Sequence, residues 1–269
     1  GNKRIASLKR RDIESFKMKL KDKKLSATSV NHVLTCLRVM LREAVYADMI
    51  PANPMDGVRR LKETSKERGI LTLAEVKELF DETKIAKVWS DNYPHFVMNY
   101  VAAVTGMRLG ELLGLQRQHV HETHIHVRYS WERKHGLKDT KTGKARDVPL
   151  NARAYSHLLE LMAMSPYKDP EHLVFWGESG EQPIEHTTAT VNLYAALKVI
   201  GIDKEERAAR GITFHSWRHF LNTTMRAAGI PDYKIRLMTG HTSDAMTDRY
   251  DNTGLEQLED LRKLQNAAL

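Results

Sequence analysis

The residues most suited to chemistry in this 269-residue chain lie between Gly211 and Tyr250. They are His215, Arg218, His241 and Tyr250: a cation, two imidazoles and a phenol. Such groups can surround a phosphate, because guanidinium and imidazole donate hydrogen bonds to its oxygens. A free phenol has a pKa of about 10 and attacks poorly at neutral pH, so a reactive tyrosine needs neighbours of this kind. The residue types therefore indicate a phosphate site that includes a phenol.

Two short helices are predicted to position these groups. Ser216 is expected to cap a helix that continues through Ala228 and is closed by Gly229. Pro231 opens a second helix at its first turn, and Gly240 ends it. One face of the first helix carries Trp217, Phe220, Leu221, Thr224 and Met225, and the second helix directs Ile235 and Met238 inward.

Two further cations lie upstream. Arg108 follows a Thr-Gly break at the first turn of a predicted helix, where free backbone N–H groups also suit an oxyanion. Taken alone, the position is more typical of a surface arginine on an amphipathic helix. Lys141 begins a predicted hairpin turn, residues 141–144, between alternating stretches at 125–129 and 145–150. An exposed turn lysine is common, and Lys138 and Lys144 compete for any role assigned to it.

Together these motifs resemble the tyrosine recombinases, the phage-integrase family. The strings that carry the resemblance are TGMRLGEL, DTKTG, FHSWRH, TGHT and a tyrosine nine residues after the last histidine. It is weak in residues 1–62 and strong from 70 to 250, and Trp217 stands where the family more often has leucine. The resemblance implies these site residues, in order: Arg108, Lys141, His215, Arg218, His241 and Tyr250, with Glu111 in support.

The roles of the arginines and histidines follow from the resemblance. Arg108 and Arg218 would clamp the non-bridging oxygens of a scissile DNA phosphate, and Glu111 would support the arginines. His215 and His241 would donate hydrogen bonds to the same phosphate. His215 would also be able to accept the proton of the attacking phenol.

The implied reaction is a transesterification. Tyr250 would attack the phosphorus and form a 3′-phosphotyrosine, and Lys141 would give a proton to the departing 5′ oxygen. Because the bond energy is conserved in the protein–DNA link, neither a cofactor nor a metal is expected. The implied partners are double-stranded DNA, a homotetramer of the chain on paired sites, and accessory directionality or DNA-bending proteins.

Charge and periodicity predict two domains. Residues 1–69 hold 17 Lys and Arg against 8 Asp and Glu, whereas the remaining 200 residues hold 25 against 26. Such a segregated basic part is typical of a polyphosphate-binding surface. We expect a mainly α (α+β) chain: a helical core-DNA-binding domain at 1–62, incomplete at its N-terminus, a linker at 63–69, and a catalytic domain at 70–269. The catalytic domain is expected to be mostly helical, with a small antiparallel sheet.

The tail and the composition give further expectations. Residues 255–264 form an amphipathic segment that is expected to pack on a neighbouring subunit. A single cysteine, Cys36, fits a reducing compartment, and no apolar run approaches the ~20 residues of a membrane span. A cytoplasmic, nucleoid-associated protein is therefore expected.

Three other functions compete with a recombinase. A helix-turn-helix regulator would use residues 216–239 without needing Tyr250, and a type IB topoisomerase would use similar phosphate chemistry as a monomer. A metal-dependent nuclease would need side chains that bind the metal ion. His215 and His219 have helical metal-ligand spacing, but the glutamate of the HExxH motif is missing. The histidine run at 119–126 also lacks that motif, and no phosphate-binding P-loop occurs.

Overall fold

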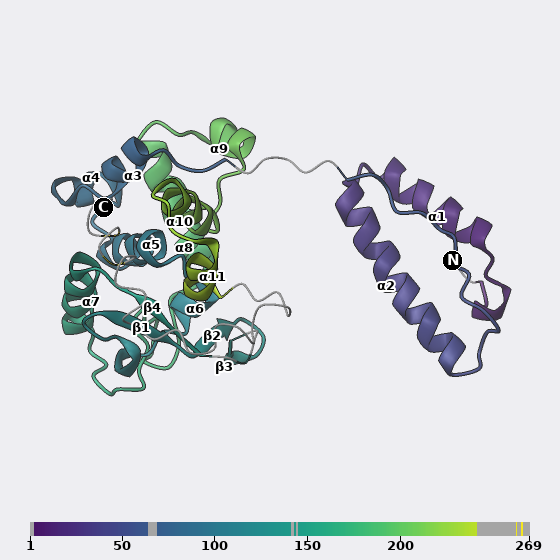
Figure 1. Ribbon diagram of the computed structural model, residues 1–269, viewed down its shortest axis with the longest axis horizontal. Helices are drawn as coiled ribbons and strands as arrows, with labels where there is room; N and C mark the ends of the chain where they lie inside the picture. The colour runs from purple at the N-terminus through teal and green to yellow at the C-terminus, as the bar shows by residue number, and fades with distance from the viewer. Residues whose placement is uncertain are drawn as a thin grey trace. The chain divides into compact units, whose positions relative to one another are not determined.

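The computed structural model describes residues 3–63, 69–140, 143, 145–240, 262 and 265. The chain divides into two compact units, residues 1–66 and 67–269, at a point inside the predicted linker (Figure 1). Helices dominate both units, and short antiparallel strand pairs occur in the second, so the predicted fold class is confirmed. None of the described helices combines the length and the apolar character that a membrane span requires.

The first unit is built on two helices, α1 (Arg10–Asp22) and α2 (Ala27–Tyr46), after a short 3₁₀ turn η1 (Ile5–Ser7). Ser26 caps α2, because its hydroxyl accepts a hydrogen bond from the Ser29 amide at 3.1 Å. Asn31 is fully buried and exchanges hydrogen bonds with both backbone groups of Leu61. This pair secures the chain that follows α2. The shared core is Ile13, Leu20, Val30, Leu34, Leu41, Ala44, Ile50, Met55 and Val58.

Helix α5 (Tyr93–Thr105) lies at the centre of the second unit (Figure 1). Every residue from His95 to Thr105 is buried, so α5 is covered on all sides. Its buried Asn99 accepts a hydrogen bond from the Trp217 indole at 2.9 Å. The helices packed against α5 are α6 (Leu109–Leu113), α7 (Ala152–Met164), α8 (His186–Val199) and α10 (Ser216–Ala227).

The described part of this unit also contains smaller elements: α3 (Leu73–Leu79), η2 (Glu82–Lys84), α4 (Ile85–Val88), η3 (Arg117–His119), α9 (Lys204–Arg210) and α11 (Asp232–Thr239). The capping box of Thr72 and Glu75 at the start of α3 is present. Helix α9 was not expected from the sequence. It buries none of its residues, so it has no apolar stripe that a periodicity argument could detect.

The strands form two separate pairs rather than one hairpin. β1 (His124–Val127) pairs with β4 (Arg146–Pro149), and β2 (Tyr129–Glu132) pairs with β3 (Gly136–Asp139), both antiparallel. The predicted strand 125–129 is therefore wrong in one respect, since the chain passes from one pair to the other after Val127. The tight turn lies at residues 133–135. Of the predicted turn 141–144, only Gly143 belongs to the described residues.

The helix pair at 216–239 is confirmed, but its predicted cap is wrong. His215 is the N-cap residue of α10, and Ser216 is the first helical residue. The Ser216 hydroxyl instead accepts a hydrogen bond from the amide of Thr213, at 3.0 Å. Gly240 ends α11 with a left-handed backbone, φ +66°, as expected.

Most of the predicted amphipathic tail lies outside the described residues. Just beyond it, the side chain of Gln265 is buried and donates hydrogen bonds to the carbonyls of Val104 and Pro149. This contact places Gln265 against the end of α5 and the end of β4.

Arg210 fixes the point at which the chain enters the second unit. Its guanidinium forms a two-pronged ion pair with Glu75, at 2.7 and 2.8 Å, and donates to the carbonyl of Ile70 at 2.9 Å. We expect Arg210→Met to lower the free energy of unfolding by about 1–2 kcal/mol, because a fork of charge-assisted bonds is lost.

Urea unfolding followed by tryptophan fluorescence would measure this change, since all four tryptophans, at 89, 131, 176 and 217, lie in the second unit. Arg226→Met is the control, because Arg226 forms an exposed ion pair with Asp232. It should change the same free energy by less than about 0.5 kcal/mol. Equal losses in the two variants would contradict the anchoring role of Arg210.

Candidate active site

The first part of the site is the sharp turn between α5 and α6. Gly106 adopts φ +64° and ends α5, and Arg108 is the N-cap residue of α6 rather than a first-turn residue. The carboxylate of Glu111 accepts hydrogen bonds from the Arg108 amide at 2.9 Å and from its guanidinium Nη1 at 2.8 Å. Glu111 is 3% exposed, whereas the Arg108 side chain is 37% exposed. The buried glutamate thus orients an arginine whose side chain still reaches solvent.

Arg218 approaches the same turn from α10. It is 2% exposed and donates from Nη1 to the carbonyl of Gly106, at 3.1 Å, and from Nη2 to the carbonyl of Thr239. Both carbonyls lie at helix C-terminal ends, of α5 and α11, where the helix dipole favours a cation. Arg218 therefore joins the two turns that precede Arg108 and His241.

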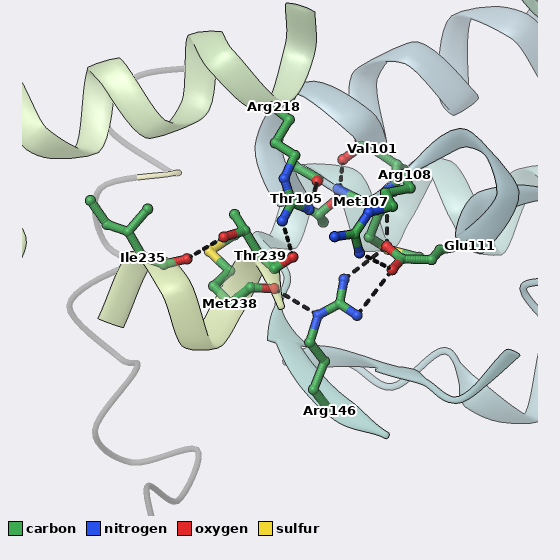
Figure 2. A network of polar contacts seen from close by, with 11 residues as sticks. Val101, Thr105, Met107, Arg108, Glu111, Arg146, Arg218, Ile235, Met238 and Thr239 are labelled. Carbon is green, nitrogen blue, oxygen red and sulfur yellow. Dashed lines mark hydrogen bonds and ion pairs between the residues drawn. The ribbon is translucent and has the colours of Figure 1, made fainter. Parts of the chain in front are cut away.

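A third guanidinium, which the sequence pattern does not single out, belongs to the cluster. Arg146, the first residue of β4, donates from Nη1 and Nη2 to the two oxygens of Glu111, at 3.1 and 2.8 Å. Its Nε also donates to the carbonyl of Met238 at 2.9 Å. Figure 2 shows the guanidinium groups of Arg108, Arg146 and Arg218 gathered around this one region.

Within the part of the chain that the structure describes, the cluster carries more positive than negative charge. Burial alone would raise the pKa of the Glu111 carboxyl, but Arg146 and Arg108 outweigh it and hold that pKa below its usual value. Burial, together with repulsion from Arg108 and Arg146, lowers the pKa of Arg218 to about 9. At neutral pH three charged guanidiniums thus lie near one carboxylate among the described residues, and two of them bind it. An anion bound beside them would relieve their mutual repulsion.

His215 lies at the N-terminal end of α10 and is exposed. Its ring is 5.1 Å from that of His219, with the ring planes at 81°. Among the described residues no group of three or more His, Cys, Asp or Glu side chains is arranged to hold a metal ion. The HExxH-like spacing of this pair thus has no third ligand in the part of the chain that the structure describes.

Three of the predicted site residues, Lys141, His241 and Tyr250, lie outside the described residues. Their neighbours Thr140 and Gly240 are described, and Gly240 directly follows the Thr239 carbonyl that Arg218 contacts. Lys138, which competed with Lys141, forms an ion pair with Glu132 within the β2–β3 pair.

A model of the phage integrase family matches residues 70–255, more than two thirds of the chain. The chain belongs to the phage integrase family. The resemblance to tyrosine recombinases found in the sequence is thereby confirmed. Similar recombinases and integrases match this chain along most of its length. Tyrosine recombinase XerC of Treponema denticola is 25% identical, with 96% of this chain and 84% of that protein covered. The integrase of Escherichia phage P2 is 29% identical, with 88% and 58% covered.

Solved structures share the fold of this recombinase. The Tn1549 transposon integrase in complex with a circular intermediate DNA matches with a TM-score of 0.74 at 20% identity, covering 96% of this chain and 86% of that one. A lambda integrase tetramer bound to a Holliday junction matches with a TM-score of 0.64 at 18% identity, covering 93% and 66%.

The surplus positive charge predicts that a small oxyanion stabilises the second unit. Sulfate at about ten times its dissociation constant should raise the melting temperature by about 3–6 °C. Arg108→Met should lose most of this rise, because one of the three guanidiniums is gone. Melting followed by tryptophan fluorescence at low millimolar sulfate, with chloride at matched ionic strength, measures it.

Arg226→Met, at the exposed end of α10, serves as the control and should keep the full rise. An equal rise in wild type and Arg108→Met would mean that sulfate acts on the protein surface in general and not on this cluster.

Proposed function

We propose that this recombinase cleaves and rejoins double-stranded DNA at specific sites, with Arg108, Lys141, His215, Arg218, His241 and Tyr250 as its catalytic residues and Glu111 in support. The observation that carries the proposal is a cluster of three guanidiniums, two of which bind the buried carboxylate of Glu111 while the third, that of Arg218, binds the carbonyls of Gly106 and Thr239. In a phosphoryl-transfer transition state the negative charge is spread over the non-bridging oxygens. Positive groups already fixed in place stabilise it without having to reorganise.

In each step one phosphorus–oxygen bond forms as another breaks, and no water is consumed. The phenolic oxygen of Tyr250 attacks the phosphorus, its proton passes to a base for which His215 is the candidate, and the 5′ oxygen leaves with a proton from Lys141. The product is a 3′-phosphotyrosine and a free 5′-hydroxyl. A 5′-hydroxyl from another duplex then reverses the step and restores the tyrosine.

In this proposal the first unit contacts the phosphate backbone of the DNA. Residues 1–69 carry a net charge of +9, and lysine and arginine bind DNA by displacing the cations that surround its phosphates. DNA affinity should therefore fall steeply with salt. We propose 1–62 as the core-DNA-binding domain and 70–269 as the catalytic domain, which clamp the duplex together.

The assembly and biological setting are inferred from relatives. A lambda integrase is a tetramer on a Holliday junction, and a Tn1549 integrase binds a circular intermediate DNA. We infer that this chain also acts as a homotetramer on paired DNA sites, to integrate and excise a phage or mobile element in the cytoplasm. Directionality or DNA-bending proteins would be its accessory partners.

Trapping the covalent intermediate tests the function. A library of nicked duplexes with a randomised core should yield a protein–DNA adduct that resists denaturing electrophoresis, because the short strand after the cleavage point diffuses away. Digestion and mass spectrometry should locate the DNA on Tyr250. EDTA should leave the yield unchanged, since guanidiniums supply the positive charge.

Tyr250→Phe should abolish the adduct while DNA affinity stays within about threefold, because one hydroxyl is lost and the basic surfaces remain. An adduct on another residue would reject Tyr250 as the nucleophile. Binding without any adduct in the wild type would favour a regulator, and cleavage that stops with EDTA would favour a nuclease.

A further inference from the structure

We propose that Arg146 is a positioning residue for DNA strand cleavage. Through Glu111 it orients Arg108, and through the backbone it fixes the end of α11, the point from which the chain continues to His241. The inference rests on the proposed function and adds to it a residue that acts through other residues.

The hydrogen bonds of Arg146 connect two segments that are remote in sequence. Two N–H groups meet the two oxygens of Glu111 in a forked ion pair, and the third meets the Met238 carbonyl. Glu111 in turn accepts from both the amide and the guanidinium of Arg108. One planar group therefore sets the distance between the α5–α6 turn and the last turn of α11.

Close packing at Gly240 strengthens this connection. A Cβ atom at that position would lie only 3.1 Å from Cζ and Nη1 of Arg146, so the guanidinium approaches the glycine backbone directly. Gly240 also needs its left-handed φ of +66° to end the helix. A change in the Arg146 side chain would thus be felt at the residue immediately before His241.

The backbone of Arg146 is itself held in place. It pairs with Val127 at one end of the β1–β4 ladder, and the following strand residues Val148 and Pro149 are buried. Its guanidinium lies at the C-terminal end of α11, where a positive charge is favoured by the helix dipole. A fixed backbone and a fully engaged fork leave the side chain few alternative positions.

Exposure separates the role of Arg146 from that of Arg108. The Arg146 side chain is 14% exposed, against 37% for Arg108. Arg146 directs three donor atoms to protein acceptors, whereas Arg108 directs one guanidinium nitrogen to Glu111. Arg108 is therefore the group presented to a phosphate, and Arg146 is the group that determines how it is presented.

The test compares Arg146→Met and Arg146→Lys with wild type on a nicked duplex that forms the adduct. At saturating DNA, Arg146→Met should slow single-turnover adduct formation about 100-fold, since a displacement near 1 Å has that effect on positioned groups. The rate for Arg146→Lys should lie between those of Arg146→Met and wild type, because lysine keeps the charge but cannot form the forked ion pair. DNA affinity should stay within about threefold in both variants.

A double-mutant cycle with Glu111→Gln tests whether Arg146 acts through the glutamate. Because the two residues form one unit, the double variant should be at most about threefold slower than the slower single variant. If Arg146 and Glu111 acted independently, their effects on the rate would multiply. Hydrogen exchange gives a second readout that needs no DNA: the amides of residues 232–240 should exchange faster in Arg146→Met.

The matched control is Arg153→Met. Arg153 likewise joins a carboxylate and a backbone carbonyl, those of Glu82 and Phe80, at 2.7 and 2.6 Å. It should keep the adduct rate within about threefold. The inference is overturned if Arg146→Met reacts at the wild-type rate, if Arg153→Met is slowed equally, or if the effects of Arg146 and Glu111 multiply. A wild type that forms no adduct instead overturns the proposed function itself.

Discussion

The organisation of the site depends on one buried carboxylate. A charged Glu111 side chain would be costly in the core by itself, and it is retained because two guanidiniums and a backbone amide satisfy its oxygens. The two arginines come from the start of α6 and the start of β4, about 40 residues apart in sequence. The same contacts that stabilise the anion therefore also bring the two segments together.

Among the residues that the structure describes, the cluster gathers three guanidiniums and one carboxylate. Burial and repulsion from the other two arginines lower the pKa of Arg218, because both add to the cost of its positive charge. Backbone carbonyls at the ends of α5 and α11 offset part of it. A phosphate would offset more, and most strongly when its charge grows in the transition state. In this phage integrase family member, the arginine cluster is the feature of the fold on which the proposed DNA chemistry is based.

Helix α5 provides the rigid support for this arrangement. Its residues are buried from His95 to Thr105, and the buried hydrogen bond between Asn99 and Trp217 links it to α10, the helix that carries Arg218. Tryptophan at 217, where the family more often has leucine, thus packs in the core and adds a polar contact. Because α5 is packed on every side, the turn at Gly106 starts from a fixed position, and so does Arg108 two residues later.

The sequence by itself determined the helices with clear apolar stripes, the glycines that end them, and the order of the family motifs. Local signals suffice there, because a cap or a periodic face involves residues three or four apart. The sequence did not predict α9, which has no apolar face, or the arrangement of the strands as two separate pairs, β1 with β4 and β2 with β3. Only the tertiary structure revealed Arg146, since a strand arginine gives no local sign of a partner 35 residues before it and another 92 residues after it. Convergence on Glu111 is a property of how distant segments pack, and that information is not contained in any single stretch of sequence.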